Sequence, residues 1–144
     1  MKNALSVAAF LAMVAGLLGL LALKSLFSPL APVIVVQALA VGLMVWARVT
    51  FGRRSFHPAA SPTAGGLVTS GPYRVIRHPI YTSVCLFVGA AVVAHWSWVT
   101  LGLGVLVLAG ALARIFAEEA LLRARYSEYA EYSARTWRMV PGVF

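Results

Sequence analysis

Long apolar runs separated by short polar stretches dominate this chain of 144 residues. A membrane-spanning helix needs about 20 apolar residues, because each residue adds about 1.5 Å to its length. The runs 4–23 and 30–47 meet or approach this length, and two shorter runs follow at 79–94 and 98–113. Only residues 95–97 separate the last two runs. The pattern therefore predicts four transmembrane helices, the last two of which form a tight hairpin.

The first run could also belong to a signal peptide, because Lys2 places a positive charge before it. The apolar region of a signal peptide usually holds about 7–15 residues and ends at a cleavage site made of small residues. Residues 4–23 form a longer uncharged run, and no convincing cleavage site follows it. We therefore expect this segment to be retained as a span.

Composition supports a membrane-embedded chain. Charged residues make up 11% of the sequence and apolar residues 61%, whereas a typical soluble domain has about 25% charged residues. The net charge of +8 would favour a nucleic-acid partner in a soluble protein. Here the basic residues flank apolar runs, so we expect an all-α integral membrane protein with one domain, 1–144, and no nucleic-acid partner.

The basic residues are distributed unevenly between the two sides of the predicted arrangement. One side carries Lys24 alone. The other side carries the remaining basic residues: Lys2, Arg48, Arg53, Arg54, Arg74, Arg77, Arg114, Arg123, Arg125, Arg135 and Arg138. Because Lys and Arg are enriched in cytoplasmic loops, we expect both termini in the cytoplasm. We expect the membrane to be the inner membrane of a bacterium or an archaeon.

The polar segments divide the predicted domain into four parts. Residues 1–51 hold the two N-terminal spans, and residues 52–78 form a cytoplasmic loop rich in Gly, Pro, Ser and Thr. Residues 79–113 form the hairpin, and residues 114–144 form a cytoplasmic helix and tail. We expect this helix to continue the fourth span out of the membrane and to end near residue 135. This last part contains all the acidic residues: Glu118, Glu119, Glu128 and Glu131.

Several polar and charged residues lie just before the third predicted span. Arg74 and Arg77 could simply anchor the helix at lipid phosphates. Pro79, however, suits the first turn of a helix, which places His78 near the N-cap, beside free backbone amides and the positive end of the helix dipole. Such a helix start attracts a carboxylate, to which either arginine could add a bidentate contact.

The pair Glu118-Glu119 admits two interpretations. The two carboxylates can form i,i+4 salt bridges with Arg114 and Arg123, each worth about 0.3–0.5 kcal/mol. Alternatively, one carboxylate accepts hydrogen bonds from a ribose diol or an amine. The residues alone leave both interpretations open. Most tyrosines fit an interfacial belt, whereas Tyr81 could face a sulfonium cation.

Two further expectations concern metals and helix packing. No metal-ligand spacing occurs in the sequence, so we predict no metal site. The glycines within the predicted spans are expected to let helices approach closely: Gly16, Gly19, Gly102, Gly104 and Gly110.

The order of these motifs resembles the isoprenylcysteine carboxyl methyltransferase family, which is related to the membrane phospholipid N-methyltransferases. The resemblance rests on Gly71-Pro72-Tyr73-Arg74-x-x-Arg77-His78-Pro79-x-Tyr81, on the hydrophobic hairpin and on Glu118-Glu119. The ending Tyr129-x-x-Tyr132 … Arg138-x-x-Pro141 is also similar. The family often has glycine where this chain has Ser83.

The resemblance implies a methyltransferase in the membrane that uses S-adenosylmethionine and acts on a lipophilic small molecule or membrane lipid, with a carboxyl group as the expected acceptor. The substrate would enter from the bilayer. The implied cofactor-binding residues are Tyr73, Arg77, His78, Pro79, Tyr81, Glu118 and Glu119. The implied catalytic residues are Arg74, Arg77 and Glu119. In this assignment Glu119 holds the ribose, and Arg74 holds an acidic group of the substrate.

Three other functions compete with this one. A membrane reductase that uses NADPH is one, because sterol reductases look distantly related in their C-terminal part. A small transporter is another, but such proteins usually carry an ionisable residue in mid-span, and no charged residue lies inside the predicted spans. The third is a non-enzymatic scaffold, in which the arginines are only anchors.

Overall fold

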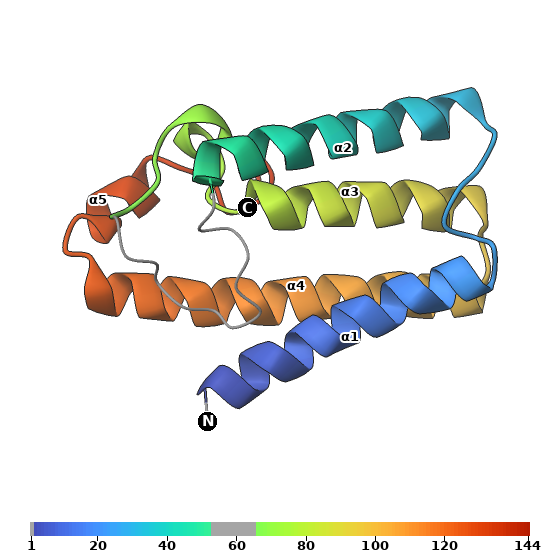
Figure 1. Ribbon diagram of the computed structural model, residues 1–144, viewed down its shortest axis with the longest axis horizontal. Coiled ribbons are helices and arrows are strands. Elements are labelled where there is room, and N and C mark those ends of the chain that lie inside the picture. Colours follow the sequence, from blue (N-terminus) through green and yellow to red (C-terminus); the bar gives the residue numbers. More distant parts are fainter. Residues whose placement is uncertain (1, 53–65) are drawn as a thin grey trace.

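The computed structural model describes residues 2–52 and 66–144 (Figure 1). Within these ranges the protein is all α-helical, as predicted, and no strand is present. The elements in chain order are α1 (Lys2–Ala22), α2 (Ala31–Phe51), the short 3-10 helix η2 (Gly71–Arg74), α3 (Pro79–Ala94), α4 (Trp98–Arg125) and α5 (Tyr129–Ala134). Arg53 and Arg54, which entered the orientation argument, lie outside the described residues.

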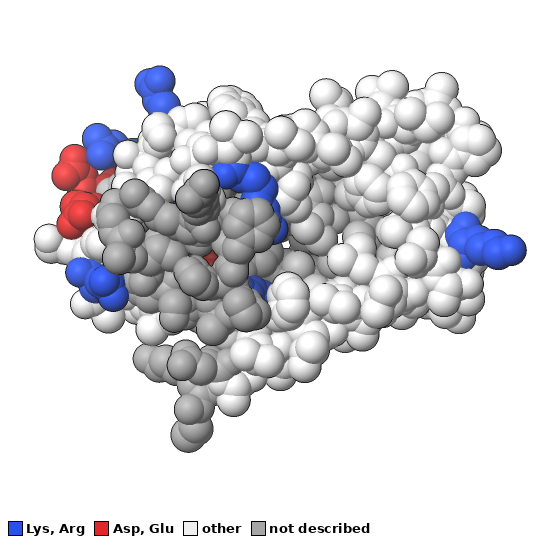
Figure 2. Space-filling model, in the orientation of Figure 1, with Lys and Arg blue, Asp and Glu red and all other residues white. Residues whose placement is uncertain are grey.

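The four long helices lie side by side, with α3 between α2 and α4 and with α1 packed on α4 (Figure 1). Consecutive helices run in opposite directions. The end of α2, the start of α3 and the end of α4 therefore meet at one end of the bundle, where α5 also lies (Figure 1). Figure 2 shows charged side chains gathered over this end. We call it the polar end.

Three helices are long and apolar enough to cross a membrane: α1 from Ala4 to Ala22, α2 and α4. Helix α3 is apolar but has 16 residues, which gives it a length of about 24 Å, less than the roughly 30 Å of a bilayer core. The protein is thus an integral membrane protein by composition and helix length. The number of four spans and the cytoplasmic orientation remain predictions.

Local sequence signals fix where the two helices of the hairpin, α3 and α4, begin. Pro79 occupies the first turn of α3, where no backbone donor is needed. Ser97 caps α4 reciprocally with Thr100: the Thr100 amide donates to Ser97 Oγ at 3.1 Å, and the Ser97 amide donates to Thr100 Oγ1 at 3.0 Å.

The last span and the helix after it form one continuous helix, as predicted. Helix α4 runs without a break to Arg125 and contains Arg114, Glu118 and Glu119. The residues after 113 are mostly Ala, Leu, Glu and Arg, which favour helix. The predicted extent of this helix to residue 135 is wrong, because Tyr126 is extended and turns the chain before α5.

Close helix packing depends on glycine at four of the five predicted positions: Gly16, Gly19 and Gly110 between α1 and α4, and Gly104 between α4 and α3. A Cβ atom added at Gly16 would lie 2.6 Å from Val107 Cγ2, and one added at Gly110 would lie 2.7 Å from the Ala9 carbonyl oxygen. The prediction is wrong for Gly102, where an added Cβ atom would meet no heavy atom of the described residues within 4 Å. Gly16 and Gly110 thus set how near α1 lies to the polar residues of α4.

Candidate functional site

A tight turn fixes the approach to α3. Gly71 has a φ of +55°, a conformation that L-residues rarely adopt. A Cβ atom added there would lie 2.6 Å from Thr50 Oγ1 on α2. Tyr73 is buried in the same turn, and its ring packs on Phe51 with 5.6 Å between centroids. The turn therefore docks against α2 and aims the following residues at α4.

The C-terminal tail fixes the next residues by backbone pairing. Ile76 forms an isolated parallel bridge with Trp137. The Arg77 amide donates to the Trp137 carbonyl at 2.7 Å, and the His78 amide donates to the Arg138 carbonyl at 3.0 Å. The backbone of the Arg-His-Pro segment is thus held from the side by residues about sixty positions later in the chain.

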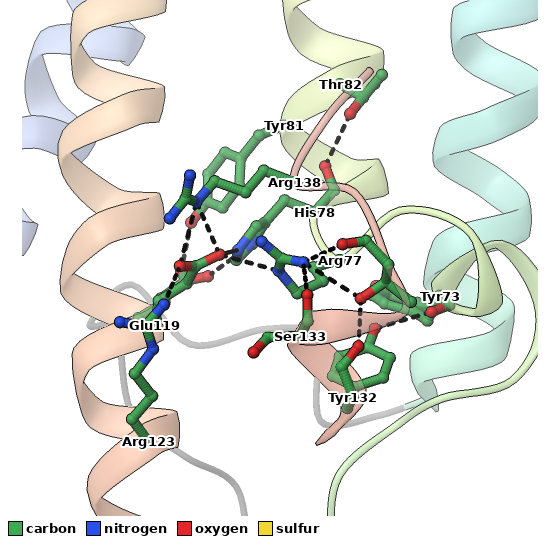
Figure 3. Close-up of polar contacts among 12 residues, drawn as sticks. Tyr73, Arg77, His78, Tyr81, Thr82, Glu119, Arg123, Tyr132, Ser133 and Arg138 are labelled. Atoms are coloured by element: carbon green, nitrogen blue, oxygen red, sulfur yellow. Dashed lines mark hydrogen bonds and ion pairs between the residues drawn. The ribbon is translucent and has the colours of Figure 1, made fainter. Parts of the chain in front are cut away.

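Glu119 is the centre of the polar cluster (Figure 3). Its side chain is 4% exposed. Oε1 accepts from Arg77 Nε at 3.0 Å, and the Nε of Arg138 lies 3.2 Å from Oε2. Arg123, one helical turn after Glu119, completes the set at 3.4 Å from Oε2. Three arginines from three parts of the chain therefore converge on one carboxylate.

The Arg77 guanidinium is anchored on its other side by the tail. Its Nη1 donates to the carbonyl of Ser133 at 2.9 Å and also to the carbonyl of Thr136 (Figure 3). Buried charged groups are costly unless they are paired and hydrogen-bonded. These contacts meet that requirement, and they leave the guanidinium little freedom to move.

His78 lies between the two adjacent carboxylates. Its Nε2 is 3.4 Å from Glu119 Oε1, and its Nδ1 is 3.7 Å from Glu118 Oε2. The histidine is 5% exposed. A neutral imidazole has one N–H, so it can donate to only one of the two carboxylates at a time.

Glu118 belongs to a second group of side chains, which faces the interior of the bundle. The Tyr81 hydroxyl donates to Glu118 Oε1. Arg114 Nε donates to the Tyr81 oxygen at 2.7 Å, and Arg114 Nη2 lies 3.4 Å from Glu118 Oε1. The three side chains form a closed triangle between α3 and α4.

Five of the residues predicted for the site are brought together by the structure: Arg77, His78, Tyr81, Glu118 and Glu119. Tyr73 and Pro79 are buried beside them and shape the backbone, and the Tyr73 carbonyl accepts from the Tyr132 hydroxyl at 2.8 Å. Arg74 is exposed at the end of η2, and none of the contacts recorded for the described residues joins it to the cluster. Its assigned role stays a prediction.

The sequence interpretation missed the contribution of the tail. Arg138, Ser133 and Thr136 contact Arg77 or Glu119 directly. The only signal was the resemblance of the ending Tyr129 to Pro141, which carried no residue roles. The interpretation also missed Tyr129, which is fully buried and whose hydroxyl has no hydrogen-bond partner among the described residues.

The electrostatics of the cluster favour polar and anionic ligands. Four guanidinium groups, those of Arg77, Arg114, Arg123 and Arg138, face only two carboxylates. Burial, together with the charge of Glu119, raises the pKa of Tyr129 to about 12. Tyr129 therefore stays a neutral donor at the edge of the cluster.

A separate cavity of about 530 Å³ lies beside the turn that begins at Gly71. Its lining comes from the end of α2 and from the segment before η2: Thr50, Phe51, Gly52, Leu67, Val68, Thr69 and Ser70. None of these residues belongs to the charged cluster, so the cavity and the cluster are distinct features of the polar end.

Comparison with known proteins gives one family and two curated relatives. The sequence profile of the family described as phospholipid methyltransferase matches residues 31–129. The chain is 42% identical over 79 residues to the nickel-cobalt-cadmium resistance protein NccN of Alcaligenes xylosoxydans xylosoxydans, a match that covers 52% of this chain and 36% of that protein. It is 40% identical over 78 residues to the cobalt-zinc-cadmium resistance protein CzcN of Cupriavidus metallidurans, covering 52% of this chain and 35% of that protein.

The chain therefore matches about a third of the length of these curated relatives. No solved structure is significantly similar to it. The profile match includes both the segment that begins α3 and the glutamate pair of α4.

Proposed function

Because the chain belongs to the phospholipid methyltransferase family, we propose that it is a membrane methyltransferase whose methyl donor is S-adenosylmethionine. One observation carries the proposal: residues 77–81 meet Glu118 and Glu119 in one buried cluster at the polar end. These two stretches lie about forty positions apart in the sequence, yet both carboxylates lie within 3.7 Å of the His78 ring.

The side chains of the cluster fit the chemistry of this cofactor. S-adenosylmethionine carries a carboxylate, an amine, a ribose diol and a sulfonium, and when bound it supplies a methyl group for in-line displacement. Guanidinium groups bind carboxylates, carboxylates accept from hydroxyls and amines, and an aromatic face favours a cation. The buried, unpaired hydroxyl of Tyr129 adds a donor that nothing in the described residues uses.

We assign the roles as follows. Glu119, supported by Glu118, would hold the ribose, and Arg77 and His78 would hold the polar end of the cofactor. Tyr81 would present its ring to the sulfonium. Because Arg77 is already fixed by two carbonyls of the tail, its charge needs little reorganisation when a ligand arrives, which is how preorganised sites gain their effect.

The acceptor we propose is a lipophilic small molecule or a membrane lipid that reaches the site from the bilayer. The membrane-length apolar helices support this class of substrate. A carboxyl group is our specific proposal for the accepting atom, because a carboxylate needs no general base to become a nucleophile. Arg74, exposed at the end of η2, would attract such an acidic group.

The same proposal places the polar end in the cytoplasm of a bacterium or archaeon, where S-adenosylmethionine is available. The positive residues concentrated at that end support this orientation. Among the described residues no group of three His, Cys, Asp or Glu could hold a metal ion.

Calorimetry with S-adenosylhomocysteine in detergent tests the proposed site. Glu119→Gln and His78→Ala should each weaken binding at least tenfold, because each removes a contact of the central cluster. Glu131→Gln is the matched control. Glu131 also pairs with an arginine four residues later, but both side chains of that pair are exposed and neither belongs to the cluster. Unchanged affinity in both site variants would refute the assignment.

Thermal unfolding separates the competing functions. A methyltransferase should be stabilised by S-adenosylhomocysteine, because a ligand that binds only the folded state raises the free energy of unfolding. A reductase should instead be stabilised by NADPH. A transporter or scaffold should respond to neither compound.

A further inference from the structure

Arg114 is a buried charged residue that has no role among those assigned to the cofactor site above. We infer that Arg114 is a positioning residue of this site, and that it makes α1 part of the site through Ser6. The inference rests on the proposed function and deepens it. Helix α1 lies outside residues 31–129, the part of the chain that the family profile matches.

The Arg114 side chain reaches three helices at once. Nε donates to the Tyr81 oxygen on α3 at 2.7 Å. Nη2 contacts Glu118 on its own helix at 3.4 Å. Nη1 lies 3.3 Å from both the carbonyl oxygen and the hydroxyl oxygen of Ser6 on α1. The guanidinium also lies 5.4 Å from the centroid of the Phe10 ring, one turn further along α1.

Burying an arginine in this way has a high cost in desolvation free energy. Arg114 is 5% exposed on a membrane-length helix, and a charged side chain within such a helix usually has a function. Removing one partner of a buried charge costs more than the pair contributes. Only arginine offers donors in a planar fork, and the three directions of its contacts use that shape.

The direction of the hydrogen bonds determines what Arg114 does. Because Arg114 donates to the Tyr81 oxygen, the single hydroxyl proton of Tyr81 is directed to Glu118. The ring of Tyr81 and the carboxylate of Glu118 are thereby fixed together, and Glu118 keeps Oε2 toward His78 at 3.7 Å. Arg114 thus acts on the site through Tyr81 and Glu118, without itself touching the ligand.

Ser6 connects this triangle to α1. Ser6 is 1% exposed, and Gly110, one turn before Arg114, lets α1 approach α4 closely at this level. If α1 were only a membrane anchor, its buried serine would have no reason to face the cluster. The geometry instead assigns α1 a share in holding the guanidinium.

A double-mutant cycle on S-adenosylhomocysteine affinity tests the inference. Arg114→Gln and Tyr81→Phe should each weaken binding about tenfold, and the double variant should weaken it by little more than either single change, because both remove the same triangle. Arg114→Lys should be as weak as Arg114→Gln, since a single ammonium cannot span the three partners. Arg135→Gln, which breaks an exposed i,i+4 pair, should leave the affinity unchanged.

Ser6→Ala tests the same claim with a smaller change, in case the Arg114 variants do not fold. It should weaken binding two- to threefold with little change in melting temperature. Ser25→Ala is its control, because the Ser25 hydroxyl donates to the Leu23 carbonyl just after α1, away from Arg114.

The outcomes separate the two proposals. If the wild-type protein binds no S-adenosylhomocysteine, the proposed function fails and the inference fails with it. If the wild-type protein binds, but the Arg114 and Ser6 variants bind equally well or the Arg114 and Tyr81 effects simply add, the inference alone is overturned. Arg114 would then be a structural ion pair between helices.

Discussion

Glu118 and Glu119 are neighbours in the chain, yet they organise two different regions of the molecule. Glu119 is almost fully buried and gathers Arg77, Arg123 and Arg138, so its region joins α3 and α4 to the C-terminal tail. Glu118 is 25% exposed in its side chain and joins Tyr81 to Arg114, so its region connects α3 and α4 to α1.

The difference follows from helix geometry. Successive residues on an α-helix point about 100° apart, so the two carboxylates face different neighbours. Within the described part of the chain, His78 is the one side chain that lies within ion-pair distance of both. The comparison shows how one pair of adjacent acidic residues can couple a tail, a helix start and an N-terminal helix into one site.

The largest expected effect on stability comes from Glu119→Gln. It leaves Arg77, whose side chain is 8% exposed, without its counter-charge, and breaking a buried pair costs about 3–5 kcal/mol. We expect a large fall in melting temperature in detergent. Glu131→Gln, at an exposed carboxylate, should change the free energy of unfolding by less than about 0.5 kcal/mol. Equal stability of the two variants would remove the distinction on which the comparison rests.

Glu118→Gln should have a smaller effect. The amide oxygen can still accept from Tyr81, and the site is partly exposed, so we expect a loss of about 1–2 kcal/mol. Ligand affinity should nevertheless fall, because the ion pair with Arg114 is lost. Chemical unfolding of the two glutamine variants side by side gives the ranking, and a Glu118 variant less stable than the Glu119 variant would reverse our account.

Gly110→Ala should disturb the Glu118 region and spare the Glu119 region. The added Cβ atom would lie 2.6 Å from Met13 Cγ and 2.7 Å from the Ala9 carbonyl, and overpacking of this kind costs about 1–3 kcal/mol. Gly102→Ala, on the same helix with open space around it, is the matched control. Thermal unfolding should separate them, and equal stability would show that α1 can shift freely on α4.

Tyr129→Phe should have the smallest effect at neutral pH. Its hydroxyl has no partner among the described residues, so its removal should leave stability unchanged or slightly higher. The pKa of Tyr129 is raised from its ordinary value to about 12 by burial, so the folded state holds this proton more tightly than the unfolded chain does.

The stabilisation linked to this proton is present below pH 10 and is lost as the pH rises through about 12. Tyr129→Phe should therefore reduce the loss of stability between pH 10 and pH 12. Tyr73→Phe supplies a comparison, because burial also raises the pKa of Tyr73. An unaltered alkaline unfolding curve in the Tyr129 variant would contradict the assigned burial.

The apolar pattern predicted the ends of a helix correctly where polar or helix-breaking residues stand at those ends. Run 79–94 matches α3 at both ends, since Pro79 starts the helix and His95 ends it. The prediction that the last helix continues past residue 113 is confirmed, but the helix ends at Arg125 and not near residue 135. The pattern also gave no sign that Arg114 is buried and paired across the bundle.

The motifs predicted which residues meet, but not how the tail holds them. The expected i,i+4 pairs of Glu118 with Arg114 and of Glu119 with Arg123 are both present. The same carboxylates also contact the segment that begins α3, through Arg77, His78 and Tyr81. The salt-bridge interpretation is therefore confirmed, and the interpretation as ligand acceptors stays a prediction. The pairing of Ile76 with Trp137 has no periodic signature in the sequence, and for that reason Arg138, Ser133 and Thr136 were missed.

Methyl transfer from radiolabelled S-adenosylmethionine into the lipid extract of membranes that contain this protein tests the central claim most directly. The account predicts label in a lipophilic product with the wild-type protein and with Glu131→Gln, and a loss of at least tenfold with His78→Ala and Glu119→Gln. Label that accumulates equally with all four proteins, or with none of them, would contradict it.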